Sequence, residues 1–221
     1  MSLMSLEPSC RIAGLVLAAG LSRRFGRPKQ LLEIDNRILL AHVLEQVLSC
    51  DLSHNILVFG YRADEIRLAL TADKILGADA LNRFQVVHNP YYESGQASSI
   101  QAGIKALAPD VSAAVFIMGD QVGLTAWHVN AVVGRYTEPD RPWVVRPRYG
   151  GRFGGPVLWA RHSFEFLEKI SGDQGGRSVI ERVPKDRVAY VDLPAAAEPV
   201  DIDTPSDLDR WLRGRTHREG R

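Results

Sequence analysis

The chain has 221 residues, of which 45% are hydrophobic and 24% are charged, an ordinary composition for a globular α/β protein with one core. Lys and Arg together number 27 against 26 for Asp and Glu, a net charge of +1, so nucleic-acid binding is not expected. No apolar run approaches the roughly 20 residues that span a bilayer. Residues 1–9 lack the pattern of a secretory signal, and Cys10 and Cys50 lack metal-site spacing; we expect a cytoplasmic protein without membrane contacts.

Strand-like and helix-like stretches alternate along the chain. The expected strands are Ile12–Ala18, Asn55–Phe59, Gln85–Val87, Ala113–Met118, Trp143–Val145, Pro156–Trp159 and Val188–Val191. The expected helices are Ile38–Leu48, Ala63–Leu70, Ala97–Leu107, Thr125–Tyr136, Phe164–Ile170, Arg177–Val183 and Ser206–Leu212. This order predicts a Rossmann-like three-layer α/β/α sandwich with a mainly parallel sheet. We expect a single domain over residues 1–221, with flexible tails at 1–10 and 214–221.

The first expected strand runs into a glycine loop that is rich in cations. Its apolar run ends at Gly20, and the loop continues through Ser22 and Arg24 to Lys29. Ligands of open α/β sheets bind beyond the carboxyl ends of such strands. Small residues at Ala18–Gly20 allow backbone N–H groups to approach a phosphate, and the cations that follow neutralise its charge. The loop therefore predicts a polyphosphate site.

Two common glycine loops do not fit this stretch. A Walker A loop requires Gly-Lys-Ser/Thr, but Arg27 and Pro28 follow Gly26. A dinucleotide fingerprint requires Gly-x-Gly-x-x-Gly, which the residues after Gly20 do not supply. The pattern Leu-Ala-Ala-Gly-x-Ser-x-Arg-x-Gly-x-x-Lys, ending at Lys29, instead resembles the signature loop of nucleotidyltransferases that transfer an NMP group. The alternative is a strand-to-helix turn with solvated basic residues.

Two acidic positions are candidate metal ligands. Asp120 follows the expected strand Ala113–Met118, on the sheet edge that carries the glycine loop. A carboxylate there would repel a triphosphate unless a cation lay between them, and Mg²⁺ binds one or two carboxylates together with phosphate oxygens. Asp203 is the expected second ligand and Asp201 the alternative; both precede the last helix, which Thr204 can cap. A surface turn or a helix cap is the other interpretation of these acids.

The segment from Asn89 to Gly103 carries small polar groups that suit a nucleobase or a ribose. Asn89 ends a strand before a proline, Gly95 permits a tight turn, and Ser98 and Ser99 open the next helix. Simple helix capping is the alternative interpretation.

Two later segments are rich in glycine, namely residues 149–156 and residues 172–177. The first contains an arginine and two aromatic residues, and the second leads into an expected helix, where an anion can bind. Together they predict a site for a planar polar acceptor that carries a phosphate. Two flexible surface loops are the alternative.

Taken together, these segments resemble the molybdenum-cofactor nucleotidyltransferase family, and within it the cytidylyltransferase branch. The resemblance runs from about Ile12 to Trp211. Its carriers are Leu17–Lys29, Gly95-x-x-Ser-Ser-x-x-x-Gly103, Gly119-Asp-Gln121, Gly154-Gly-Pro156, Gly172-Asp-x-Gly-Gly-Arg177 and Asp201-Ile-Asp-Thr-Pro205. The resemblance implies one Rossmann-like nucleotidyltransferase domain that transfers CMP from CTP to the phosphate of molybdopterin, releases pyrophosphate and requires Mg²⁺.

The resemblance and the motifs together assign roles to individual residues. Catalytic roles are expected for Arg24, Lys29 and Asp120, with the metal held by Asp120 and Asp203. The expected nucleotide-binding residues are Leu17, Ala18, Ala19, Gly20, Ser22, Arg24, Lys29, Asn89, Gly95, Ser98, Ser99 and Asp120. The expected acceptor-binding residues are Gly154, Gly155, Pro156, Asp173 and Arg177.

Single residues separate the branches of this family. Ala19 stands where guanylyltransferases tend to have glycine, which favours CTP, although one methyl group contributes only about 1–3 kcal/mol of discrimination. Gly155 stands where the family commonly has histidine, and Val122 where it commonly has proline, so the donor is better specified than the acceptor.

Three other activities remain as alternatives. They are a guanylyltransferase or another NTP transferase of this fold, a nucleotide-binding chaperone that delivers finished cofactor to a molybdenum hydroxylase, and an NAD-linked oxidoreductase. The absence of a dinucleotide fingerprint disfavours the oxidoreductase.

Overall fold

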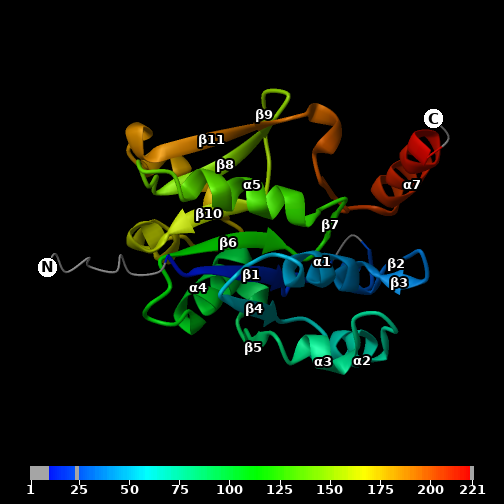
Figure 1. Ribbon diagram of the computed structural model, residues 1–221. Helices are drawn as coiled ribbons and strands as arrows, with labels where there is room; N and C mark the ends of the chain where they lie inside the picture. Colours follow the sequence, from blue (N-terminus) through cyan, green and yellow to red (C-terminus); the bar gives the residue numbers. More distant parts are fainter. Residues whose placement is uncertain (1–9, 23–24, 220–221) are drawn as a thin grey trace, which may run out of the picture.

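The computed structural model describes residues 10–22 and 25–219 (Figure 1). Its centre is an eight-stranded sheet in the order β11-β8-β10-β6-β1-β4-β5, with β9 paired to β8. The strands are β1 (Ile12–Ala18), β4 (His54–Phe59), β5 (Gln85–His88), β6 (Ala113–Met118), β8 (Val144–Tyr149), β9 (Arg152–Phe153), β10 (Val157–Ala160) and β11 (Val188–Leu193). β10 is antiparallel to both of its neighbours and β9 to β8, whereas the remaining pairs are parallel. The predicted mainly parallel sheet is confirmed.

The centre of the sheet is built from continuous apolar runs. All seven residues of β1 are buried, as expected for a strand covered on both faces. β1 lies between β4 and β6 in parallel register, with Ala18 opposite Phe59 and Leu17 opposite Met118. The segments that follow β1 and β6 therefore begin side by side at one edge of the sheet.

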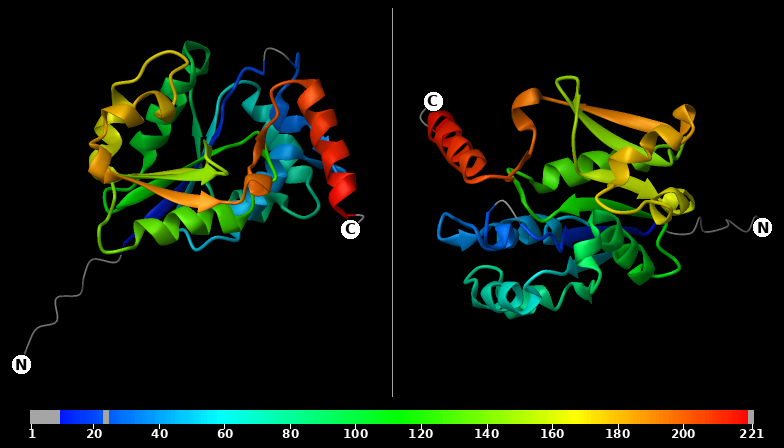
Figure 2. Two further views of the ribbon diagram at one scale, coloured as in Figure 1. Left: turned by 90° about the horizontal axis from the view of Figure 1, so that it is seen from above. Right: turned by 180° about the vertical axis from the view of Figure 1, so that it is seen from behind.

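Helices cover both faces of the sheet (Figure 2). They are α1 (Leu39–Leu48), α2 (Ala63–Ala72), α3 (Gly77–Leu81), α4 (Gln96–Ala106), α5 (Ala126–Tyr136), α6 (Phe164–Glu168) and α7 (Pro205–Glu219). One hydrophobic core joins α1, α2 and α5 to the sheet, and a second core joins α4 and α6 to the opposite face. This arrangement is the expected three-layer sandwich.

Two small antiparallel pairs lie outside the main sheet. β2 (Glu33–Ile34) and β3 (Arg37–Ile38) form a hairpin whose turn residues Asp35 and Asn36 have φ of 52° and 62°, values that Asn and Asp tolerate better than most residues. β7 (Gln121–Val122) pairs with β12 (Val200–Asp201). This second pair brings the chain near its C-terminus back to the end of β6. Neither pair is among the predicted elements.

The last helix begins where the sequence indicates. The Thr204 backbone N–H and hydroxyl both donate to the Asp207 carboxylate at 2.8 Å, and the Asp207 N–H donates to the Thr204 hydroxyl at 3.3 Å. This reciprocal cap precedes α7, which runs to Glu219, past the expected end at Leu212 and into the segment where a tail was expected. No helix within residues 10–22 and 25–219 combines the length and apolar content needed to cross a membrane.

One expected helix, Arg177–Val183, is wrong. The chain forms two short 3₁₀ turns there, η4 (Gly176–Ser178) and η5 (Ile180–Arg182). Val179 separates them and is fully buried. Glycine precedes the segment and Pro184 follows it, and both residue types disfavour a continuous α-helix. The strand β8, which lies between β11 and β10, is also longer than the expected Trp143–Val145.

Candidate active site

The sheet edge at the ends of β1 and β6 opens into a cleft of about 870 Å³. The cleft is lined by the glycine loop after β1, by η2 (Tyr92–Ser94) and the start of α4, and by acids from two distant segments. Among the expected nucleotide contacts, Leu17, Ala19, Gly20, Ser22, Lys29, Gly95, Ser99 and Asp120 line it. The cleft is therefore assembled by the motifs that were expected to meet there.

Lys29 is at the centre of the charged cluster in this cleft. Its Nζ atom lies 2.5 Å from Oδ2 of Asp120 and 2.9 Å from Oδ1 of Asp203. The side chains of Lys29 and Asp120 are only 13% and 15% exposed, whereas that of Asp203 is 55% exposed. Burial by itself lowers the pKa of the Lys29 ammonium, but attraction and hydrogen bonds from the two carboxylates outweigh this, so its pKa is raised. The ammonium is therefore held charged.

The glycine loop positions Lys29 through its backbone and its neighbour. The Lys29 N–H donates to the Ser22 hydroxyl at 2.9 Å. The buried Gln30 donates its side-chain amide to the carbonyl of Ala18 at 3.1 Å. These bonds tie the 3₁₀ turn η1 (Lys29–Leu31) to the end of β1, so the ammonium is directed toward the end of β6.

The small β7–β12 pair places the C-terminal acids. Asp201 pairs with Gln121, and the Ile202 N–H donates to the carbonyl of Asp120 at 3.3 Å. Although much of Asp201 is exposed, loss of water around its carboxyl group raises its pKa, and the charge of Asp120 raises it further. Three carboxylates therefore lie close to one ammonium.

The same residues fit a divalent cation that also contacts a ligand. Oδ1 of Asp120 is buried and has no hydrogen-bond partner among the described residues, so one oxygen at the centre of the cluster lacks the partner that buried polar atoms normally have. Within that part of the chain, no three His, Cys, Asp or Glu side chains are grouped closely enough to enclose a metal ion. Two carboxylates with phosphate and water oxygens match the preference of Mg²⁺.

Asn89 is placed differently from the expectation. It is buried, and its side-chain amide donates to the hydroxyls of Ser98 and Ser99 at 2.9 and 3.0 Å. Its Oδ1 accepts from the N–H of Tyr91 at 2.9 Å. Neither Asn89 nor Ser98 lines the cleft. Asn89 thus holds the η2 turn against the start of α4, and only Ser99 of this group faces the cleft.

Gly95 joins the two glycine-rich parts of the site. Its φ is 106°, and a side-chain carbon there would come within 2.2 Å of the Gly172 carbonyl carbon. A hydrogen bond joins the same two segments, because the Ala97 N–H donates to the Gly172 carbonyl at 3.0 Å. A residue without a side chain is required for this close approach.

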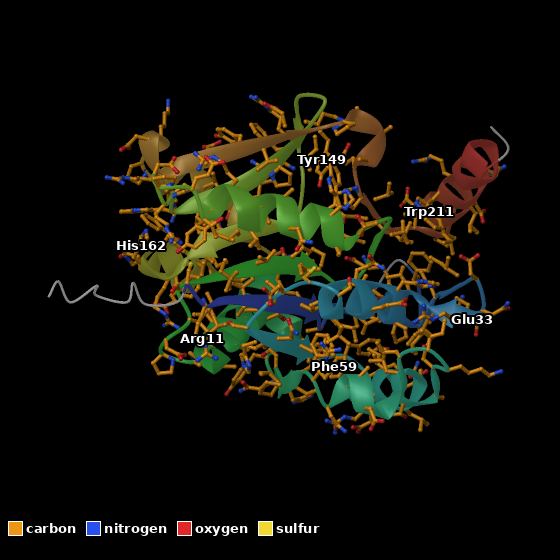
Figure 3. All side chains as sticks on the ribbon, viewed as in Figure 1. Arg11, Glu33, Phe59, Tyr149, His162 and Trp211 are labelled. Carbon is orange, nitrogen blue, oxygen red and sulfur yellow. The ribbon has the colours of Figure 1, made fainter. Side chains whose placement is uncertain are left out.

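A second pocket, of about 240 Å³, continues from the cleft. The two share Leu17, Gln96, Met118 and Asp201 as a common wall. Gly154, Gly155 and Arg177 of the expected acceptor residues line the second pocket, while Asp173 lines the cleft. Tyr149 is labelled in Figure 3. Its hydroxyl donates to the Gly155 carbonyl at 2.7 Å and holds the segment 154–155 in place.

Some expected site residues lie elsewhere, and some lining residues were missed. Ala18 and Pro156 do not line either pocket, and Arg24 lies outside the described residues. Gln96 and Arg146, which line the second pocket, are not among the residues expected from the sequence. The sequence does contain a sign that Arg146 is unusual, because this charged residue interrupts an apolar stretch between Val145 and Pro147. The sequence around Gln96 contains no comparable sign.

Comparison with known proteins gives a consistent result. The family model described as the MobA-like NTP transferase domain matches residues 14–188. Purine catabolism protein PucB of Bacillus subtilis (strain 168) is 26% identical over 203 residues, covering 91% of this chain and 96% of the relative. Nicotine blue oxidoreductase of Paenarthrobacter nicotinovorans is 28% identical over 207 residues, with the same two coverages.

Solved structures agree with the fold. The homologue of Mycobacterium tuberculosis Rv0371c from Mycobacterium sp. strain JC1 superposes with a TM-score of 0.77 at 28% identity, covering 94% of this chain and 98% of that one. Rv0371c of M. tuberculosis H37Rv in complex with manganese gives a TM-score of 0.73 at 24% identity, covering 92% and 98%. The matched family region includes Lys29 and Asp120 but ends before Asp203.

Proposed function

Because the chain belongs to the MobA-like NTP transferase family, we propose that it transfers CMP from CTP to a molybdopterin-type acceptor and releases pyrophosphate. The observation that carries the proposal is the meeting of Lys29, Asp120 and Asp203 in the cleft. A cation and carboxylates beside a glycine loop suit a metal-bound triphosphate. The client would be a molybdenum hydroxylase in the cytoplasm.

The glycine loop and Lys29 would hold the donor nucleotide. Ala19 and Gly20 line the cleft, where backbone N–H groups can approach phosphate oxygens. The methyl group of Ala19, which stands where guanylyltransferases tend to have glycine, supports CTP over GTP. Lys29 would exchange its contact with Asp203 for the phosphates, because that carboxylate is the more exposed of its two partners.

Asp120 and Asp203 would hold Mg²⁺, with Asp201 next to them. The bound ion would neutralise charge between these carboxylates and the phosphates. Manganese in the related Rv0371c structure supports a divalent ion in this fold. The unpartnered Oδ1 of Asp120 is the feature of this chain that fits it.

The proposed reaction is an in-line displacement at the α-phosphorus. An oxygen of the acceptor phosphate forms the new bond while the bond to pyrophosphate breaks. The acceptor is already anionic, so no general base is required. The residues would act by positioning the two substrates and by stabilising the charge that develops on pyrophosphate, with Lys29 supplying positive charge.

Pyrophosphate release tests this proposal. Protein, molybdopterin and Mg²⁺ are mixed with CTP or GTP, and pyrophosphate is measured with and without EDTA. We expect release with CTP that stops on chelation and returns with Mg²⁺ or Mn²⁺. A preference for GTP would contradict the cytidylyltransferase assignment. Tight CTP binding without release would indicate a nucleotide-binding chaperone instead.

A further inference from the structure

The second pocket is mostly apolar and has two glycine-rich walls. Phe116, Trp159, Leu167 and Ile180 contribute side chains, and the residues 154–155 and 175–176 contribute backbone. A side-chain carbon at Gly155 would lie 3.3 Å from the Gln121 amide, and one at Gly176 would lie 3.3 Å from the Trp159 ring. The walls therefore lack side chains where space is narrow, which suits a flat molecule.

Arg146 is a buried cation in this apolar pocket. It lies on β8, is 9% exposed, and its guanidinium is 4.3 Å from the centre of the Phe153 ring. Its Nε atom is buried without a hydrogen-bond partner. Over the described part of the chain, no carboxylate forms an ion pair with it. Charged side chains are rarely buried in this way unless something pairs with them.

A second arginine adds to the positive charge instead of offsetting it. Arg177 also lines the pocket. Burial lowers the pKa of Arg146, and repulsion from Arg177 lowers it further. Asp201 is the only acid among the described residues that line this pocket, and its charged neighbours are Asp120, Asp203 and Lys29. The arginines are thus left without a counter-charge.

We propose that Arg146, together with Arg177, forms an anion-binding subsite of this pocket, and that a negatively charged group of a flat acceptor binds there. The identification of the ligand as the acceptor rests on the proposed function; the subsite itself rests on the burial of Arg146 and on its lack of an ion-pair or hydrogen-bond partner among the described residues. A guanidinium presents several donors in one plane, which suits a phosphate or carboxylate group.

Arg148 provides a matched control. It lies two residues further along β8, but it is more exposed and its guanidinium is paired with both oxygens of Asp192, at 2.5 and 2.7 Å. Replacing Arg148 removes one positive charge from the same strand without touching the pocket. An effect confined to Arg146 would therefore not be a general effect of charge.

Calorimetric titration with phenyl phosphate and with benzyl alcohol tests the subsite. Phenyl phosphate should bind the wild-type protein, and Arg146→Gln should weaken it at least about tenfold, because a charge-assisted bond is lost. Arg148→Gln should leave the affinity unchanged, and benzyl alcohol should not distinguish the variants. Equal binding of phenyl phosphate by Arg146→Gln and the wild type, or no binding by the wild type, would overturn the subsite.

Two further measurements separate this inference from the proposed function. Arg177→Gln, at an exposed position, should also weaken phenyl phosphate and serves if Arg146→Gln does not fold; unchanged binding by it would remove Arg177 from the subsite. CTP binding should be the same in all variants, because neither arginine lines the cleft. Phenyl phosphate binding through Arg146 without pyrophosphate release from CTP would refute the transferase and leave the subsite standing.

Discussion

Lys29 lies between two carboxylates, whereas Arg146 lies among aromatic and aliphatic side chains with no carboxylate paired to it in the described structure. Both cations are largely buried, and both lie in connected parts of one site. In the cleft, the protein supplies the counter-charge itself. In the second pocket it does not.

The charges around Lys29 are therefore balanced within the protein, whereas the charge of Arg146 would be balanced only by a bound ligand. Breaking a buried ion pair leaves an uncompensated charge and costs stability. An unpaired buried cation already carries that cost in the folded protein. The comparison therefore predicts that similar substitutions have opposite effects on the two sides of the site.

The largest effect is expected on turnover. Lys29→Ala and Asp120→Asn should each lower pyrophosphate release by at least about a hundredfold, by analogy with the loss of a preorganised charged group. Steady-state release assays at saturating CTP measure this, and circular dichroism verifies folding. Near wild-type turnover in both variants would remove these residues from the catalytic machinery.

Thermal unfolding of two methionine variants should separate the regions. Lys29→Met should lower the free energy of unfolding by about 3 kcal/mol, because Asp120 keeps a buried charge without its partner. Arg146→Met should raise it by about 1 kcal/mol, because removing a buried charge without an anionic partner outweighs the lost contact with the Phe153 ring, while most of the volume is kept. Calorimetry without ligands, at one pH, measures both. A loss of stability in Arg146→Met would contradict the idea that this cation is unpaired.

A smaller effect should distinguish the two carboxylates. Asp203 is far more exposed than Asp120, so water and salt screen its charge more strongly. We expect Asp203→Asn to lower pyrophosphate release by about tenfold, less than Asp120→Asn. The concentration of Mg²⁺ needed for half-maximal activity should rise in Asp203→Asn. An unchanged metal requirement would shift the second ligand role to Asp201.

Much of the fold was predictable because its signals are local. The apolar run of β1, the glycine loop after it and the capped start of α7 each depend on residues close together in the chain. Parallel β-α-β order then places the ends of β1 and β6 at one edge of the sheet. The meeting of Lys29 with Asp120 follows from that order, although the two residues are 91 positions apart.

The errors have a common physical origin in tertiary packing. Residues 177–183 were expected to form a helix, yet the need to bury Val179 and Ile180 in a short segment between Gly176 and Pro184 produces two 3₁₀ turns. Asn89 carries the polar group expected at a ligand site, but it binds Ser98 and Ser99. Local composition does not say whether a polar side chain turns toward a ligand or toward its own helix.

By itself, the amino-acid sequence determined the layered α/β order, the glycine loop after β1 and the family, because each is expressed in short runs of residues. Only the tertiary structure decided which C-terminal acid reaches Lys29. Asp203 is 174 positions away from Lys29 in the sequence, and the β7–β12 pair brings the two residues together. The tertiary structure alone also placed Arg146 in an apolar pocket beside Arg177. Whether a charge is paired depends on neighbours from distant segments, and pairing between distant segments is decided when the sheet and its covering layers pack together.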